Sequence, residues 1–546
     1  MLGTFLGLET STQGLRANQA AIETVSHNID NANTPGFSRQ RVDTTASLAL
    51  PVPGMLTAGA GQIGTGVQIQ AVTRLRDQYL DDQYRSQNQY LGQATTQQDT
   101  LNKISSILNE PSNTGLSTSM QNFWQAWGTL SGNPDDPTAR TVVLDNGQAL
   151  AQSLNQTAQQ IGKLSSDLGS NLTSNITQAN QYIDQIATLN QQIDAIQAVG
   201  NTPNDLMDQR DLLVDKLSSM GDVKTSDAGG VFSVTLAGQT VVQGNAALMH
   251  ITATPSNPIL PTELDVATIT TGVLGGIQQS QTLVSDYGKQ LDHLANSLAT
   301  GNMTTKLPDT WTFPTAPAGT PTFSVSGTFA DGTTFTAGTP VSTYPASEYS
   351  QTALTDGTIL TTLAAGATVT VAGLNGLQKL GYSPNGQGAD FFTSSVAGQS
   401  INASNIQVSL GVNDIATALN PGTTTPLTAK PGDGSLAIAT DSMKDTQVSI
   451  IDPTAPASAS TVNVTLDSFY QSVIGQLGVQ SQSANQQVTN QTGVVQQIDT
   501  QRQSVSGVSI DQEMSNMVQF QQSYNASARV ISAINEMLTT LVNLGK

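Results

Sequence analysis

Apolar side chains recur at seven-residue steps near both ends of the chain. In the C-terminal stretch, residues 510–544, the seven-residue repeat consists of Ile510, Met517, Tyr524, Ile531 and Leu538. Three further apolar residues, Phe520, Ile534 and Leu541, each lie three residues after a member of the repeat. In the N-terminal stretch, residues 2–30, the repeat consists of Leu8, Leu15, Ile22 and Ile29. This spacing is typical of amphipathic helices that pack in heptads. It predicts one long helix at each end, each with a single apolar stripe.

The N-terminal helix is expected to end at the sequence Asn33-Thr34-Pro35-Gly36. Proline cannot continue the helical hydrogen-bond ladder, and it disfavours the α conformation at Thr34. Pro-Gly suits the two central positions of a type II turn, because Pro presets φ and Gly accepts a positive φ. The motif therefore predicts a turn that redirects the chain from the terminal helix to the next domain.

Between the two ends, helical patterns give way to β-rich patterns and then return. Helical periodicity covers residues 74–108, a stretch around 123–127, residues 137–200 and residues 205–219. Short alternating runs typical of strands follow at 231–242, 302–377, 406–410 and 448–451, interrupted by a helical pattern at 283–298. Helical periodicity returns at Val464 and breaks at Ser506-Gly507 before the terminal helix.

This nesting predicts an α+β multidomain fold, in which N- and C-terminal segments share a long α-helical bundle with inserted β-rich domains. A chain of 546 residues is long enough for several domains. The expected division has terminal helices, disordered until assembly, at 1–40 and 507–546; a helical bundle at 41–220 and 441–506; a β-rich inserted domain at 221–301 and 377–440; and a second small β-rich insert at 302–376. The last insert is expected to be a dispensable surface module.

Composition narrows the classes of partner. The chain has 40 acidic and 20 basic residues, a net charge of −20, and no cysteine. So acidic a chain, without a Lys/Arg cluster, is not expected to bind nucleic acid, and disulfides and cysteine-ligated metals are excluded. No apolar run approaches the ~20 residues of a membrane span, and the N-terminus lacks the features of a cleaved Sec signal. A cytoplasmic protein and one exported by a machine that reads an uncleaved N-terminus both fit.

No group of residues predicts catalysis, a cofactor or a metal. His27, His250 and His293 lie in different predicted elements, with no carboxylate at ligand spacing. The glycines within 59–64 fit GxGxxG, but the next residues alternate as a strand where a dinucleotide site needs a helix. Acidic pairs such as Asp81-Asp82 are interpreted as solvated. We therefore predict no catalytic, cofactor-binding or metal-binding residue, and no enzyme.

Motifs at both ends carry a family resemblance. Residues 26–40 read Ser-His-Asn-Ile-Asp-Asn-Ala-Asn-Thr-Pro-Gly-Phe-Ser-Arg-Gln, and the C-terminal region contains Ser506-Gly507-Val508, Glu513-Met514 and the segment 526–531. These motifs resemble those of the bacterial flagellar axial proteins, the family of rod, hook and hook-associated proteins, and the Ser-Arg-Gln variant is similar to the hook-associated members. Segments 208–213 and 385–392 are similar more loosely, whereas residues 303–376 match nothing in that family.

The resemblance implies a structural protein of the flagellum at the junction of hook and filament. It implies export through the flagellar type III apparatus to the cell exterior without a cleaved signal peptide. The implied partners are other copies of the chain in a ring, the hook protein, the next hook-associated protein, and an export chaperone on the C-terminal helix. The apolar stripes would form the assembly interface and fold as neighbours cover them. The alternatives are another axial protein, such as hook or distal rod protein, and a surface adhesin.

Overall fold

The computed structural model describes residues 2–51, 62–254, 262–315, 319–423, 425–451 and 461–544. The chain divides into two compact units, each assembled from separate segments. Unit 1 comprises Met1–Gln97, Asn171–Gln278 and Asn485–Lys546, and unit 2 comprises Gln98–Ser170 and Gln279–Ala484. These boundaries do not coincide with the four parts expected from the sequence. That four-part division, including disorder of the ends before assembly, stays a prediction.

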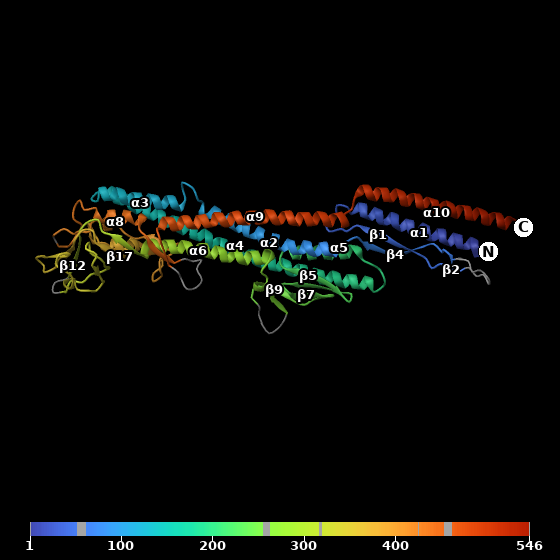
Figure 1. The fold of residues 1–546 in the computed structure, drawn as a ribbon, viewed down its shortest axis with the longest axis horizontal. Coiled ribbons are helices and arrows are strands. Elements are labelled where there is room, and N and C mark those ends of the chain that lie inside the picture. The colour runs from blue at the N-terminus through green and yellow to red at the C-terminus, as the bar shows by residue number, and fades with distance from the viewer. Residues whose placement is uncertain are drawn as a thin grey trace. The chain divides into compact units, whose positions relative to one another are not determined.

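The long helices lie where the apolar periodicity predicts them (Figure 1), whereas the short α7 and α8 were not predicted. Their bounds are α1 Leu2–Asp30, α2 Gln78–Leu108, α3 Leu116–Gly132, α4 Pro137–Gln197, α5 Asn204–Ser218, α6 Gly272–Thr300, α7 Gly373–Gln378, α8 Ser435–Asp441, α9 Leu466–Ser506 and α10 Ile510–Leu544. Helix α2 begins later than the predicted residue 74, because that residue still belongs to a strand. The long α4 begins at Pro137, and proline is tolerated in the first turn of a helix because the amide hydrogen it lacks is not needed there.

Unit 1 contains two β substructures. Strand β1 (Gln40–Ala46) pairs antiparallel with β4 (Val67–Arg74), and a bulge interrupts the register between Asp43 and Thr44. A four-stranded meander contains β5 Val223–Ala228, β6 Val231–Leu236, β7 Gln239–Gln243 and β8 Ala246–Ala247. The β6–β7 hairpin was predicted, and its two loop residues, Ala237 and Gly238, both have positive φ, as a tight hairpin turn requires. Shorter pairs are formed by β2 Leu50–Pro51 with β3 Gln62–Ile63 and by β9 His250–Thr252 with β10 Glu263–Asp265.

The β region of unit 2 is organised by one six-stranded sheet. Its strands, in spatial order, are β14 Thr334–Phe335, β13 Ser326–Thr328, β17 Thr368–Ala372, β11 Asn302–Lys306, β22 Val448–Ile451 and β23 Thr461–Val464. A three-stranded sheet contains β12 Trp311–Thr315, β16 Ile359–Leu363 and β15 Tyr349–Ala353. Two hairpins complete the region, β18 Tyr382–Ser383 with β19 Gly386–Gln387 and β20 Phe392–Ser394 with β21 Ile406–Val408.

The segment 302–376 is therefore continuous with the rest of unit 2. Its strands β11 and β17 lie in the middle of the six-stranded sheet, where β11 pairs with β22 through Met303 and Val448. The buried Trp311 indole N–H donates to the Leu380 carbonyl at 3.1 Å, and the Tyr382 hydroxyl donates to the Thr312 carbonyl at 3.1 Å. The expectation of a surface module was wrong, because these buried contacts join the segment to residues outside it. That the segment is dispensable for the junction stays a prediction.

The aromatic residues of α3 belong to the core of unit 2, as their helical spacing predicts. Phe123 and Trp127 are fully buried and contact Phe391, with ring centroids 5.7 Å apart in both cases. Gly147 on α4 faces the same cluster, and a side chain there would meet the Phe391 ring at 2.7 Å. Burial of three large rings against a glycine fixes the spacing of α3 and α4 in this part of the unit.

Excision of residues 303–376 with a short Gly-Ser bridge should abolish the cooperative melting of unit 2, because it removes two central strands. The finer change Trp311→Ala should cost about 3–5 kcal/mol of unfolding free energy, as for other buried aromatic truncations. The control Val396→Ala, at an exposed position of the same unit, should alter that free energy by less than about 0.5 kcal/mol. Thermal and denaturant melts measure both, and an unchanged melt after excision would show that the segment is a separate module.

Candidate functional site

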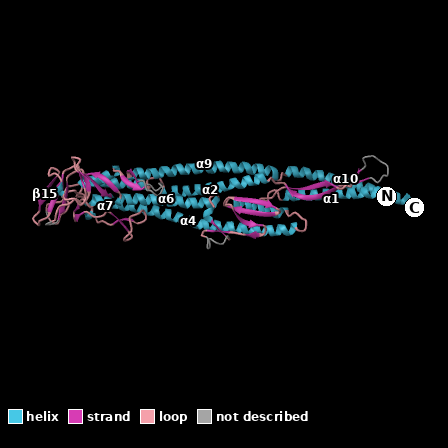
Figure 2. Ribbon diagram, turned by 60° about the horizontal axis from the view of Figure 1, so that its bottom comes forward, coloured by secondary structure: helices cyan, strands magenta, loops and turns pink. Residues whose placement is uncertain are grey.

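Helices α1 and α10 lie side by side and antiparallel in both views of unit 1 (Figures 1 and 2). They face each other at seven-residue steps on both helices, through the contacts Gly7–Ile534, Gly14–Ser527 and Asn28–Glu513. The same step places Ala21 opposite Phe520, and both residues line one pocket. A Cβ atom added at Gly7 would lie 3.4 Å from Ile534 Cδ1, and one at Gly14 would lie 3.5 Å from Ser527 Oγ. We call these four pairs the seam. Small residues on α1 allow the two helices to approach closely there.

The predicted stripe on α1 lies one residue beyond the seam. Leu8, Leu15, Ile22 and Ile29 are half-buried beside it. The buried apolar side chains of α1 are instead the small or short ones, Ala17, Ala21 and Val25. The large apolar side chains of the N-terminal helix are thus only partly covered by their own chain.

On α10 the predicted positions divide into two groups. Phe520 and Ile534 lie on the seam, and Ile534 is 8% exposed. The half-buried positions beside it are Met517, Tyr524, Ile531 and Leu538. The side chain of Leu541 lies outside the described residues. Sequence periodicity missed a second set of apolar residues, all largely exposed: Met514, Val518, Val530 and Met537.

The motif Asn33–Gly36 forms the turn that its sequence predicts. The Phe37 amide donates to the Thr34 carbonyl at 3.2 Å, which closes a turn with Pro35 and Gly36 at its centre. Gly36 has φ +81°, a value that L side chains rarely adopt. A Cβ atom at Gly36 would also lie 3.0 Å from Leu212 Cβ on α5. Position 36 therefore requires glycine for two reasons: its positive φ, and the lack of space for a Cβ atom beside α5.

A buried carboxylate joins this turn to the C-terminal helix. Glu513, in the first turn of α10, is 1% exposed. Its Oε1 accepts from Arg39 Nε at 2.8 Å and lies 2.8 Å from Arg39 Nη2, while its Oε2 accepts from Asn28 Nδ2 at 2.9 Å. Asn28 also bonds the backbone of Gln40 through both side-chain atoms, at 2.9 Å each. We call Asn28, Arg39, Gln40 and Glu513 the polar lock.

Helix α5 provides a second layer beneath the turn. Asp208 accepts from the Ser38 amide at 2.8 Å, the Ser38 hydroxyl at 2.7 Å and Arg74 Nη1 at 2.8 Å. Burial raises the pKa of Asp208, and the bonds from Arg74 and Ser38 oppose that rise. Gln40 Nε2 adds a bond to Asp205 Oδ1 at 2.8 Å. The residues that follow the turn are thus held by α5 through buried, charge-assisted hydrogen bonds.

The ion pairs continue from α5 to α2 and α9. Burial opposes ionisation of Asp211, yet Arg76 and Arg74 hold its pKa below the usual value. Asp81 is 6% exposed and binds both Arg76 and Arg502, at 2.9 and 2.8 Å. The interpretation of Asp81 as solvated was wrong, because its partners lie on other elements. A single sequence gives no signal for pairs whose members lie up to several hundred residues apart.

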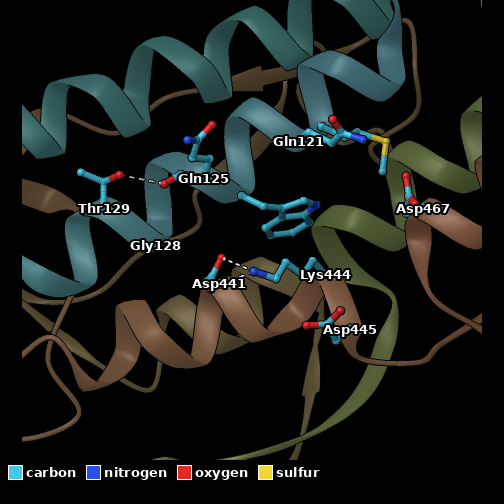
Figure 3. Close-up of a pocket in the computed structure, with 10 residues that line it drawn as sticks. Gln121, Gln125, Gly128, Thr129, Asp441, Lys444, Asp445 and Asp467 are labelled. Carbon is cyan, nitrogen blue, oxygen red and sulfur yellow. Dashed lines mark hydrogen bonds and ion pairs between the residues drawn. The ribbon is translucent and has the colours of Figure 1, made fainter. Parts of the chain in front are cut away.

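A separate cavity of about 540 Å³ lies in unit 2, between α3, α8 and the start of α9 (Figure 3). Trp124 lines the cavity together with Asp441, Asp445 and Asp467. Lys444 binds both carboxylate oxygens of Asp441 at 3.1 Å, and the Thr129 hydroxyl donates to the Gln125 carbonyl. Lys444, Asp441 and the Thr129 hydroxyl are thus already bonded within the wall of the cavity.

Within the described ranges, no group of three or more His, Asp or Glu residues is placed to hold a metal ion. None of the described helices is both long and apolar enough to cross a membrane. Of the GxGxxG glycines, those at 59 and 61 lie outside the described residues, and Gly64 precedes strand β4, as the sequence predicts.

Comparison with known proteins identifies three matching regions. Residues 101–302 match the family model of the flagellar hook-associated protein FlgK helical domain. Residues 8–37 match that of the flagella basal body rod protein, and residues 499–544 match that of the flagellar basal body rod FlgEFG protein C-terminal region. The two terminal matches contain most of α1 with its turn and all of α10, the two helices that form the seam.

Full-length relatives are similar along the whole chain. Flagellar hook-associated protein 1 of Bacillus subtilis is 31% identical, with 100% of this chain and 99% of that protein covered. The protein of the same name from Salmonella typhimurium is 29% identical, over 97% and 98% of the two chains, and that of Escherichia coli is 26% identical, over 98% and 99%. The structure of the flagellar hook junction protein FlgK from Burkholderia pseudomallei aligns at 20% identity with a TM-score of 0.44, over 77% of this chain and 100% of that one.

Gly36→Val should weaken the turn on two counts, backbone strain of about 1–3 kcal/mol and a clash with Leu212. Gly200→Val is the matched control, because Gly200 has φ +85° but nothing within 4 Å of its added Cβ. The first variant should lose protection of the Phe37 and Arg39 amides from hydrogen exchange, whereas the control should not. Equal effects from both variants would show that only strain matters.

Glu513→Gln removes the charge that faces Arg39 while keeping the shape of the side chain. Because breaking one partner of a buried ion pair costs about 3–5 kcal/mol, the helix pair should separate at lower temperature. Asp511→Asn, at an exposed position in the same turn, serves as the control and should leave the pair intact. Hydrogen exchange along α10 measures the effect, and unchanged exchange in Glu513→Gln would mean that the lock does not hold the helices.

Proposed function

The chain belongs to the flagellar hook-associated protein 1 family, and on that premise we propose that it joins hook to filament through its paired terminal helices. As a member of this family it is a structural component of the bacterial flagellum at the hook–filament junction, and its relatives are structural proteins. The proposal adds how the junction forms. Copies pack side by side through the outer faces of α1 and α10, while the polar lock and α5 hold the pair at a fixed angle to the rest of unit 1.

The observation that carries this proposal is the incomplete cover of the large apolar side chains. Leu15 and Ile22 are half-buried, and Met514 and Val518 are largely exposed. The seam itself buries little apolar surface, because two of its α1 residues are glycines and a third is alanine. Burying a large apolar side chain contributes about 1.5–3 kcal/mol, so neighbouring copies can supply what the solitary pair lacks.

Coupled folding follows from the same balance. Ordering one residue costs about 1–2 kcal/mol of backbone entropy, and an isolated helix gains little from its own hydrogen bonds in water. For a helix pair held only by the polar lock and a seam of small residues, the stabilising contacts are close to this entropic cost of ordering. We propose that the predicted interface residues, from Leu8 to Ile29 and from Met517 to Leu541, become fully ordered and buried only in the assembly.

The partner set follows from position in the flagellum. The proposed neighbours are further copies of the chain in a ring, the hook protein on one side and the next hook-associated protein on the other. Export by the flagellar apparatus proceeds without removal of a signal peptide. An export chaperone covers the apolar positions of α10 before assembly. Its exposed apolar residues support the last point, since such a helix is otherwise prone to associate early.

A chain limited to residues 41–506 tests the role of the helix pair. It should be soluble and folded, because the main apolar cores of both units lie within it, but it should not restore filaments to cells that lack the full chain. Cells that produce only the shortened chain should carry hooks without filaments and release filament protein into the medium. Thermal melts and electron microscopy give the two readouts. Filaments retained by the shortened chain would contradict the proposal.

A further inference from the structure

The dipeptide Asn-Gly occurs three times in the chain, at residues 146–147, 375–376 and 385–386. Its asparagine is chemically labile, because glycine has no Cβ atom to shield the backbone nitrogen that follows the asparagine. That nitrogen can attack the carbon of the side-chain amide and expel ammonia. In a folded protein the reaction depends on how firmly the backbone and the side chain are held.

Two of the three asparagines are held by their surroundings. Asn146 lies inside helix α4, and its Nδ2 donates to the Val142 carbonyl at 2.8 Å. Asn375 is 5% exposed, and both polar atoms of its side chain bond the backbone of Phe392, at 2.7 and 2.9 Å. A helical backbone keeps the attacking nitrogen in its hydrogen-bond ladder. Both residues would therefore have to leave a packed helix before they could react.

Asn385 lies in a different setting. It is exposed, and it forms with Pro384 the two-residue loop between strands β18 and β19. The ladder behind this loop comprises two residue pairs. A ladder this short frays easily, and fraying frees the Gly386 nitrogen for attack. Asn385 and Asn146 are both followed by Gly-Gln, so the two sites share their local sequence and differ in structure.

The bonding partner of the Asn385 amide gives the modification a consequence. Asn385 Nδ2 donates to Asp414 Oδ1 at 2.7 Å. This bond joins the hairpin to the start of the buried segment 415–419, in which the Thr417 amide donates to the Tyr382 carbonyl at 3.1 Å. A carboxylate at position 385 has no hydrogen to donate and would face Asp414 as a like charge.

We propose that Asn385 is a site of spontaneous deamidation, and that the product loosens the hairpin from Asp414. The Gly386 nitrogen forms a bond to the side-chain carbon of Asn385 and loses its proton to solvent. The carbon–nitrogen bond of the amide breaks, and the departing group takes up a proton and leaves as ammonia. Water then opens the cyclic succinimide at either carbonyl, which yields aspartate or isoaspartate. The reaction needs only this hairpin and water, so it does not depend on the proposed junction role.

Peptide mapping of the purified full chain by mass spectrometry tests the site. During incubation at mildly alkaline pH, the amide of Asn385 should be lost roughly tenfold faster or more than those of Asn146 and Asn375, because packed helices protect them. Part of the product should be isoaspartate, which an isoaspartyl methyltransferase labels. In denaturant, Asn385 and Asn146 should react at similar rates. Equal rates in the folded chain would overturn the proposal, as would a difference that persists in denaturant.

Asn385→Gln is the matched control for the reaction. Glutamine keeps the amide group, but its longer side chain would have to close a larger ring, which forms more slowly. The glutamine peptide should therefore stay unconverted over the same time. Conversion at the rate of the natural peptide would place the change on another residue and would contradict the assignment to Asn385.

Asn385→Asp reproduces one product and tests its consequence. The Thr417 amide should exchange its hydrogen roughly two- to fivefold faster, the size of effect expected for like charges that face each other. Combining Asn385→Asp with Asp414→Asn restores a donor and an acceptor with their positions exchanged, so exchange should return to its original rate. Unchanged exchange in the single variant, or no recovery in the double variant, would show that deamidation does not loosen the hairpin in this way.

Discussion

The arrangement of the two chain ends depends on the buried carboxylate of Glu513. It is held by Arg39 just after the turn and by Asn28 in the last turn of α1, so one side chain connects both terminal helices to the start of β1. A buried charge without a partner costs free energy, and this cost makes the polar lock favour one register of α1 against α10. Other registers of α1 against α10 would leave Glu513 unpaired. The seam alone could not select a register, because glycine and alanine pack almost equally well at several offsets.

The electrostatic layers beneath the lock explain how the terminal pair is oriented within unit 1. Asp208 and Asp211 on α5 gather arginines from β4 and from the loop after it, and Arg502 brings in the end of α9. These groups are buried and therefore little screened by salt. Their geometry is more directional than apolar packing, since each guanidinium has a fixed fork of donors. The turn at Gly36 is consequently supported from below by α5 and from the side by α10.

Sequence periodicity could predict the helices and the turn, because these depend on local spacing and on the special conformations of Pro and Gly. It could not identify the contact face of α1. The heptad of Leu8, Leu15 and Ile22 is the obvious apolar signal, whereas the actual seam one position earlier is built from glycine and alanine, which give almost no hydropathy signal. The sheet that includes β11 and β22 was missed for a different reason. Its strands come from segments about 145 residues apart, and single-sequence patterns do not reveal such pairing.

The pairing of α1 with α10, helices that lie far apart along the chain, has a consequence for synthesis. Protein synthesis proceeds from the N-terminus, so α1 exists long before α10. A chain interrupted anywhere between residues 40 and 512 retains Arg39 and Asn28 but lacks the Glu513 carboxylate that joins them. Truncated products therefore cannot close the terminal pair, however well their middle parts fold. Closure of the terminal helix pair therefore depends on synthesis having passed Glu513.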